Sequence, residues 1–202
     1  MSQLQKILSV REQIADVLRS DIIAGDLKPN TKLNEQQLAE RFGTSRGPIR
    51  DVLLKLTKEG LLVSRNNVGS SVSSPLDPEL QKLSIGIRRK IEEFAVKQLE
   101  GKLTIEHFTD LEAIIEEMHD HFEGGRYTEL TKTDIAFHQY LVEAAGGEDL
   151  VNIWYPIVIR MRMNYKRITT SIKLVEEHKD IVDALKVNDT KAAINAIRRN
   201  IK

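Results

Sequence analysis

The sequence predicts a mainly α-helical protein in two parts. Three segments between residues 10 and 60 show the apolar spacing of amphipathic helices, and two short strand-like runs follow them. Beyond residue 78 the helical spacing continues along the chain, punctuated by glycines and by one Asn-Asp step. We therefore expect a front domain over residues 1–74, a linker over residues 75–78, and an all-α bundle of six helices over residues 79–202.

The charge distribution indicates what kind of partner each part suits. The 202 residues include 30 Lys and Arg and 30 Asp and Glu, so the formal net charge is zero. Residues 1–76 hold 11 basic and 8 acidic residues (net +3), which leaves 19 and 22 (net −3) for residues 77–202. A basic front part suits a polyanion, and nucleic acid is the commonest one.

Two further features narrow the class of protein. The chain has no cysteine, which excludes disulfides and thiolate metal ligands. The longest apolar stretch, residues 150–159, is too short and too polar to span a bilayer, and the first ten residues do not resemble a signal peptide. We expect a cytoplasmic protein with no membrane partner.

Each helix of the front domain has its own start and stop signals. The first helix covers residues 10–24 and ends at Gly25. Asn34 caps a short second helix, which Gly43-Thr44 breaks, and Ser45 caps a third. The apolar face of this third helix consists of Ile49, Val52, Leu53 and Leu56.

A β-hairpin is predicted directly after the third helix. Strand-like runs at residues 61–65 and 68–73 flank Asn66-Asn67, and asparagine tolerates the left-handed conformation of a tight turn. Three helices followed by a hairpin make a winged helix-turn-helix. In helix-turn-helix folds the last helix enters the major groove of DNA.

The candidate DNA contacts lie at the start of the third helix. Arg46 and Arg50 are four residues apart and face away from the apolar side, where they can bond guanine or clamp phosphate. The alternative is the solvated charged face of an ordinary helix, but the surrounding helix-turn-helix and hairpin favour DNA reading. Secondary contacts are expected from Gln36, Thr44, Ser45 and Gly47 near the helix ends, and from Arg65 and Asn67 in the wing.

The rear part contains polar residues within its apolar stripes. Asp134 and His138 fall, one turn apart, on the inward stripe of the third rear helix, and His178 falls on that of the fifth. Asn200 occupies a similar inward position on the last helix. One carboxylate, two imidazoles and an amide can bind a divalent metal such as zinc, nickel or manganese. They can equally satisfy one another as a buried hydrogen-bond network, and the spacing leaves both interpretations open.

The run from Arg11 to Val72 resembles the GntR family of bacterial transcription regulators. The matching runs include Ile23-Ala24-Gly25-Asp26-Leu27-Lys28-Pro29, Leu33-Asn34-Glu35 and Ser45-Arg46-Gly47-Pro48-Ile49-Arg50. By position, the resemblance implies DNA contacts at Gln36, Arg46, Arg50 and the wing around Asn67. The family often has arginine where Gln36 stands, and a Gly-Arg-Gly wing where this chain has Asn67-Val68-Gly69.

The helical part resembles the FCD effector domain of the FadR/VanR branch of that family. Asp134-Ile135-Ala136-Phe137-His138 matches its signature run, and His178 matches its next metal ligand. The last ligand is usually a histidine after two arginines, whereas Asn200 follows Arg198-Arg199 here, so we expect weaker metal binding.

The same resemblance implies a small organic acid as the effector. It places Arg88 toward the effector pocket, and the alternative for this residue is a surface arginine paired with Glu92. Spacing adds Arg160 and Asn164 as candidate pocket residues.

The leading hypothesis is a homodimeric transcription regulator, not an enzyme, that binds a palindromic operator and acts as a repressor released by a small carboxylate. A metal-dependent hydrolase using Asp134, His138 and His178 is the first alternative, although no HExxH run supplies a general base. An architectural DNA binder without an effector is the second.

Overall fold

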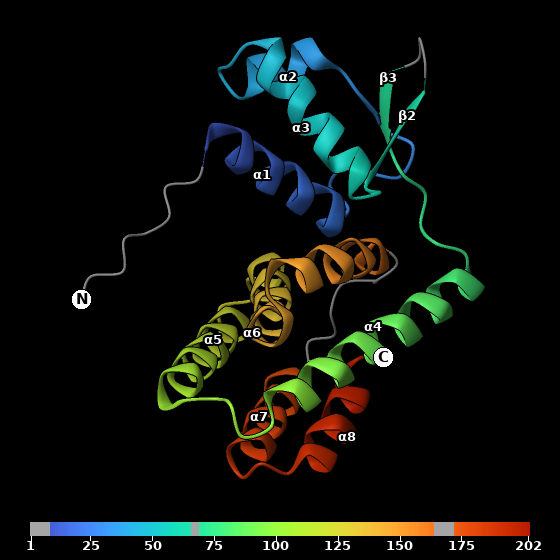
Figure 1. Cartoon of the computed structure of the whole chain (residues 1–202). Coiled ribbons are helices and arrows are strands. Elements are labelled where there is room, and N and C mark those ends of the chain that lie inside the picture. The colour runs from blue at the N-terminus through green and yellow to red at the C-terminus, as the bar shows by residue number, and fades with distance from the viewer. Residues whose placement is uncertain (1–8, 66–68, 164–171) are drawn as a thin grey trace. The chain divides into compact units, whose positions relative to one another are not determined.

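The computed structural model describes residues 9–65, 69–163 and 172–202. The chain divides into two compact units, Met1–Pro75 and Leu76–Lys202, each described here by itself (Figure 1). The first unit combines three helices with a small sheet and the second is helical, so the predicted fold class is confirmed.

The helices of the first unit follow the predicted boundaries closely. They are α1 (Val10–Ala24), α2 (Glu35–Arg41) and α3 (Arg46–Lys58). Gly25 ends α1 in the left-handed conformation, with φ 84°. The side chain of Asn34 caps α2 by accepting hydrogen bonds from the backbone N–H groups of Gln36 and Gln37. Ser45 occupies the N-cap position of α3, but its side chain makes no cap hydrogen bond.

The wing contains one strand more than predicted. β2 (Leu62–Arg65) and β3 (Gly69–Val72) pair antiparallel, and β1 (Lys32–Leu33) pairs with the other edge of β3. The sheet order is therefore β1-β3-β2. A strand of two residues is too short to show alternation, which is why the sequence did not reveal β1. The hairpin turn at residues 66–68 lies outside the described residues.

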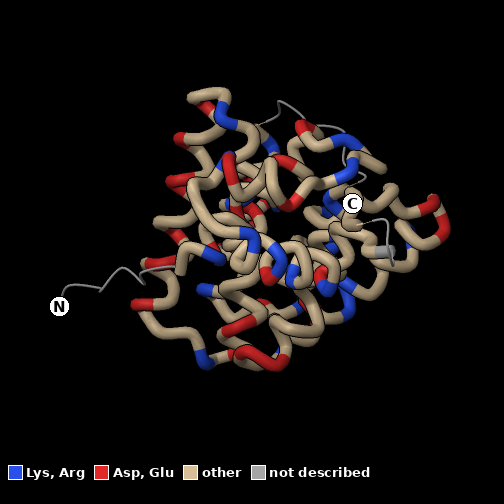
Figure 2. The backbone as a smooth tube through the Cα atoms, turned by 90° about the horizontal axis from the view of Figure 1, so that it is seen from above, with Lys and Arg blue, Asp and Glu red and all other residues tan. Residues whose placement is uncertain are grey.

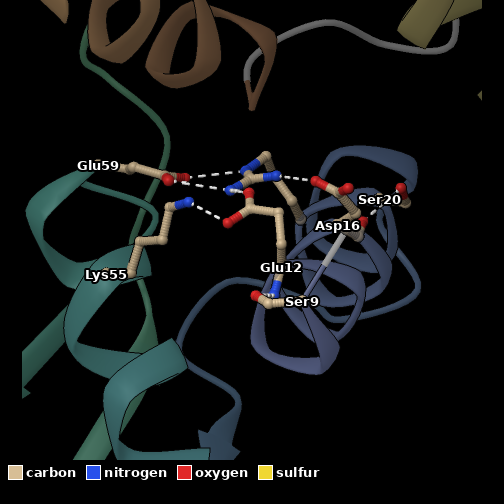
Figure 3. A network of polar contacts seen from close by, with 7 residues as sticks. Ser9, Glu12, Asp16, Ser20, Lys55 and Glu59 are labelled. Carbon is tan, nitrogen blue, oxygen red and sulfur yellow. Dashed lines mark hydrogen bonds and ion pairs between the residues drawn. The ribbon is translucent and has the colours of Figure 1, made fainter. Parts of the chain in front are cut away.

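A buried ion pair joins α1 to the end of α3. Arg19 donates from Nε and Nη2 to the two carboxylate oxygens of Glu59, each at 2.9 Å. Figure 3 shows the surrounding network, in which Lys55 of α3 donates to Glu12 of α1 at 2.5 Å. Asp16 also pairs with Arg19. These bonds fix the C-terminal end of α3 against α1, and the packed apolar residues of both helices complete the core: Ile14, Leu18, Ile49, Val52 and Leu56.

The second unit is a bundle of helices. Its longest helix, α6 (Tyr127–Arg162), has non-helical backbone angles at Gly147 (φ 62°, ψ −160°) and so consists of two helical segments. With these two counted separately, the described part of the unit has the six helical segments that the sequence predicts. Residues 164–171, between the fourth and fifth segments, lie outside the described residues. The helices are α4 (Pro78–Leu99), α5 (Ile105–Glu123), α6 (Tyr127–Arg162), α7 (Lys173–Lys186) and α8 (Thr190–Asn200).

The core of this unit brings the inward faces of α4, α5, α6, α7 and α8 together. Its apolar part includes Val96, Leu111, Phe137, Ile181 and Ile197, all almost completely buried. Within the described ranges, no helix is long and apolar enough to cross a membrane. Figure 2 shows that basic residues (Lys and Arg) and acidic residues (Asp and Glu) are interspersed along the backbone, in keeping with the net charge of zero.

Candidate functional sites

The predicted arginine pair is exposed at the N-terminal end of α3. The side chains of Arg46 and Arg50 are 54% and 60% exposed. Both converge on one oxygen of Glu35 in the first turn of α2: Arg46 Nη2 lies 2.9 Å from Oε2 and Arg50 Nε lies 2.8 Å from it. The hydrogen bonds from Arg46 and then Arg50 hold the pKa of Glu35 below its usual range, so this carboxylate is ionised at neutral pH. The two guanidinium groups are thus held side by side.

Sequence reasoning did not assign a role to Glu35. The residue stands in the Leu33-Asn34-Glu35 run that carried the family resemblance, but the pairing joins residues 11 and 15 positions apart across a turn. Only the angle between α2 and α3 brings them together. The sequence offered one signal for this pairing: an acidic residue, Glu35, begins the helix that comes before the helix with the two arginines.

The secondary DNA candidates surround the arginine pair. Gln36 is exposed, and its amide donates to Glu40 at 2.9 Å. Ser45 and Gly47 are exposed and Thr44 is half-buried, all at the turn between α2 and α3. Arg65 ends β2, and Asn67 lies outside the described residues.

The predicted interior cluster is assembled from α6 and α7. Asp134 and His138 lie one turn apart on α6, and His178 faces them from α7. All three are almost completely buried, and each offers a ligand atom within 4.8 Å of the others. Asp134 Oδ1 lies 3.3 Å from His178 Nε2. The Nε2 atoms of His138 and His178 are both buried, and neither has a hydrogen-bond partner among the described residues.

The other nitrogen of each imidazole is occupied. His138 Nδ1 lies 2.7 Å from Glu92 Oε2, and His178 Nδ1 lies 2.7 Å from the carbonyl oxygen of Leu174. Burial lowers the pKa of both histidines to about 4, so both rings are neutral at physiological pH. Because each Nδ1 donates to an oxygen, each Nε2 carries the lone pair. Metal-binding histidines are oriented in this way by their outer partners.

Glu92 is a buried residue that sequence reasoning treated only as a partner for Arg88. It accepts hydrogen bonds from Arg88 Nε and Trp154 Nε1, both at 2.8 Å, as well as from His138. Burial by itself raises the pKa of Glu92, but His138 and Arg88 reverse this effect and hold it well below its usual range. Arg88 is 2% exposed, so the alternative of a surface arginine is wrong although its pairing with Glu92 is right. Its Nη2 atom is buried without a hydrogen-bond partner among the described residues.

Arg162 is the second residue that the sequence did not point out. It lies in the last turn of α6, and its Nη2 forms a buried ion pair with Asp134 Oδ2. The predicted Arg160 instead approaches Met163, with Nη1 2.8 Å from its sulfur. Asn164 lies outside the described residues. The spacing indicated an arginine near the end of this helix, but not which arginine turns inward.

Asn200 approaches the cluster from its outer side. Its Nδ2 lies 3.4 Å from Nδ1 of His178, the nitrogen that also faces Leu174. The nitrogen that faces Asp134 is Nε2. In this arrangement Asn200 contacts the back of a candidate ligand, whereas the other three predicted residues converge.

Two family models match successive parts of the chain. Residues 10–72 match the model described as bacterial regulatory proteins, gntR family, and residues 84–202 match the FCD domain. The chain belongs to the gntR family and carries an FCD domain. The resemblance found in the sequence is therefore confirmed for both parts.

Individual gntR-family proteins resemble this one along almost its whole length. A probable D-xylose utilization operon transcriptional repressor of Paenarthrobacter nicotinovorans is 28% identical over 96% of this chain and 86% of its own. The transcriptional repressor RspR of Escherichia coli is 27% identical over 100% of this chain and 90% of its own. The solved structure of E. coli McbR/YncC has a TM-score of 0.83 at 20% identity, covering 96% of this chain and 94% of that one, and shows the shared fold. This protein is a DNA-binding transcription regulator.

Proposed function

We propose that this regulator is a cytoplasmic homodimer that represses transcription from a palindromic operator and releases it when a small organic acid binds the FCD domain. The observation that carries the DNA-binding half is the exposed pair Arg46 and Arg50, held together by Glu35 at the start of α3. Two guanidinium groups at the N-terminal end of a recognition helix can reach guanine edges or phosphates. A dimer repeats this reading at two half-sites, which is why the operator is expected to be palindromic.

The remaining DNA contacts are proposed from their position beside the pair. Gln36, Thr44, Ser45 and Gly47 border the N-terminal end of α3, where backbone N–H groups suit a phosphate oxygen. An added Cβ at Gly47 would meet nothing within 4 Å, so backbone can approach DNA closely there. The wing contributes Arg65 and Asn67, as the sequence predicts.

The interior cluster fits a divalent metal. Asp134, His138 and His178 would hold it, because each offers a ligand atom within 4.8 Å of the others and both histidine Nε2 atoms are buried without a hydrogen-bond partner among the described residues. Zinc, nickel and manganese suit this set of nitrogen and oxygen donors. A bound metal supplies positive charge that attracts a carboxylate.

Arg162 sets the affinity of that site. Its guanidinium already neutralises Asp134, so a metal ion has to compete with a cation attached to the same chain. Asn200, which replaces the family histidine, contacts only the outer nitrogen of His178. Both features support weak, exchangeable metal binding.

The proposed effector is a small carboxylate because Arg88 offers a buried cationic donor next to the interior cluster, to which it is joined through Glu92. Arg88 has a buried Nη2 available to an anionic oxygen, and its Nε is fixed by Glu92. Arg160 and Asn164 remain candidate pocket residues from their spacing alone. A ligand of this kind changes DNA affinity only by the difference in its own affinity for the DNA-bound and free arrangements.

A two-stage experiment tests the proposal. Selection of duplexes from a random library should return a palindromic sequence with two half-sites, whereas a non-palindromic consensus would contradict the dimeric reader. Small carboxylates are then tested by thermal shift with and without manganese, and a ligand at 100 times its Kd should stabilise the fold by about 2.7 kcal/mol. Any carboxylate that raises the melting temperature should also weaken operator binding. Stabilisation that leaves operator affinity unchanged would contradict the effector role.

A further inference from the structure

The carboxylate of Glu92 lies between the candidate metal site and the effector arginine. One oxygen, Oε2, is 2.7 Å from Nδ1 of His138, and the other, Oε1, accepts from Arg88 Nε and Trp154 Nε1, both at 2.8 Å. The side chains of Arg88, Glu92 and His138 are at most 3% exposed, so water does not replace a contact that weakens. A change at one oxygen therefore alters the contacts of the other.

Glu92 also ties together segments that lie far apart in the sequence. His138 precedes the break at Gly147 in α6 and Trp154 follows it, whereas Arg88 and Glu92 lie on α4. The carboxylate therefore joins both segments of α6 to α4. Three donors from two helices on a single buried carboxylate form a network whose members respond to one another.

The contact with His138 decides which of its nitrogens can bind a metal. An ionised carboxylate only accepts hydrogen bonds, so Nδ1 of His138 carries the proton and donates to Glu92. The lone pair is then on Nε2, which is buried without a hydrogen-bond partner among the described residues. An outer carboxylate also raises the basicity of the imidazole that it contacts. Glu92 thus prepares His138 as a ligand without being a ligand itself.

The contact with Arg88 has the opposite effect on an anion. The guanidinium of Arg88 is held through Nε, and its Nη2 is buried without a hydrogen-bond partner among the described residues. The negative charge of Glu92 offsets part of the positive charge of Arg88, so it lowers the affinity of Arg88 for a second carboxylate. With a metal on Nε2, the Nδ1–H of His138 is a stronger donor and draws the charge of Glu92 away from Arg88.

We infer that Glu92 is a positioning residue that couples the candidate metal site to Arg88. It holds His138 ready for a metal, and it restrains Arg88 until that site is filled. This inference rests on the metal and the carboxylate effector proposed above, and it adds how the binding of one promotes the binding of the other. Since coupling between two binding equilibria is reciprocal, a carboxylate on Arg88 also tightens the metal.

The manganese affinity of Glu92→Gln tests the first half of the inference. In the full chain after chelator treatment, the Kd for manganese from calorimetric titration should rise by about 10- to 100-fold, the usual cost of losing an outer partner of a metal ligand. Glu93→Gln is the matched control, because Glu93 is the next residue, is also buried, and pairs with Arg198 instead of His138. Its manganese Kd should equal that of the wild type.

Acetate binding to the metal-free protein tests the second half. Glu92→Gln removes the counter-charge of Arg88, so the Kd for acetate should fall by about tenfold. Melting temperatures in acetate and in chloride at equal ionic strength give this Kd. Glu93→Gln should leave it unchanged, and Arg88→Met/Glu92→Gln should lose the acetate response. Damaged packing would weaken both ligands, whereas the inference requires manganese to weaken and acetate to tighten. No acetate response in Glu92→Gln, or an unchanged Kd, would overturn it.

A second pair of variants applies if circular dichroism shows that Glu92→Gln does not fold. Arg88→Met/Glu92→Gln replaces the buried ion pair by two neutral side chains of similar size, and it is compared with Arg88→Met alone. The double variant should bind manganese about tenfold or more weakly than the single one, and an equal Kd would overturn the inference.

The wild type separates this inference from the proposal on which it rests. A wild type that binds no manganese would overturn the metal site proposed above together with this coupling. A wild type that binds manganese no more tightly than Glu92→Gln would overturn the coupling alone.

Discussion

Glu35 holds Arg46 and Arg50 at the surface of the first unit, whereas Asp134 holds Arg162 in the interior of the second. Both groups use arginine and carboxylate, but their surroundings differ. At the surface, water solvates each charge when the pair opens, so the arginines can exchange Glu35 for DNA phosphate at little cost. In the interior, an opened pair leaves two charges without solvent, so only another ion can replace a member. The exposed group of Glu35, Arg46 and Arg50 is thus suited to reading a partner. The buried pair of Asp134 and Arg162 is suited to detecting an ion.

The largest expected effect comes from removing the interior carboxylate. Asp134→Ala removes the carboxylate that pairs with Arg162 and faces His178 in the interior, and should reduce the free energy of unfolding by about 3–5 kcal/mol. Urea denaturation of the metal-free protein measures this. Asp180→Ala is the matched control, because Asp180 pairs with Arg199 at an exposed site and should cost under about 1 kcal/mol. Equal losses of unfolding free energy in the two variants would contradict the distinction between the buried and the exposed ion pairs.

A smaller effect is expected from removing the interior cation. Arg162→Met frees Asp134 from its buried ion pair. Contacts between charged groups of this kind are worth about 1.5–3 kcal/mol, so manganese or zinc should bind roughly ten- to a hundredfold more tightly. Calorimetric titration after chelator treatment gives the affinity. Arg160→Met, two residues away beside Met163, is the control and should change it little. Unchanged or weaker metal binding in Arg162→Met would show that Arg162 does not compete for this site.

The smallest effect is expected from neutralising the surface carboxylate. Glu35→Gln removes the charge that occupies Arg46 and Arg50, so affinity for an unrelated duplex should rise by about two- to fivefold. Operator affinity should rise less, because the arginines lose their fixed orientation. Fluorescence anisotropy with both duplexes measures the ratio, and Glu40→Gln on the same helix serves as the control. A fall in affinity for the unrelated duplex would mean that Glu35 supports DNA binding and does not restrain it.

Residues that follow local patterns could be predicted from the sequence. Helical spacing, caps and glycine stops gave the three front helices and the rear segments, and the polar residues on apolar stripes gave Asp134, His138 and His178. The spacing of Arg88 and Glu92 was visible as an i, i+4 pair. Each of these signals lies within one or two turns of a helix.

The partners that fix these residues could not be predicted in the same way. Arg162 meets Asp134 across 28 residues of sequence, and Trp154 meets Glu92 across 62. Both contacts depend on how α6 folds back on itself at Gly147 and packs on α4, which periodicity does not encode. The strand β1 escaped notice because its two residues acquire their conformation from pairing with β3.

The salt dependence of operator binding tests the account most directly. Wild-type protein and the double variant Arg46→Ala/Arg50→Ala are compared over a series of potassium chloride concentrations, after urea denaturation has shown that both are equally stable. If the exposed pair reads DNA, the double variant should bind the operator at least about tenfold more weakly, and its log–log salt slope should be shallower by up to about two for each half-site. Equal affinity and an equal slope for the two proteins would contradict the assignment of α3 as the recognition helix.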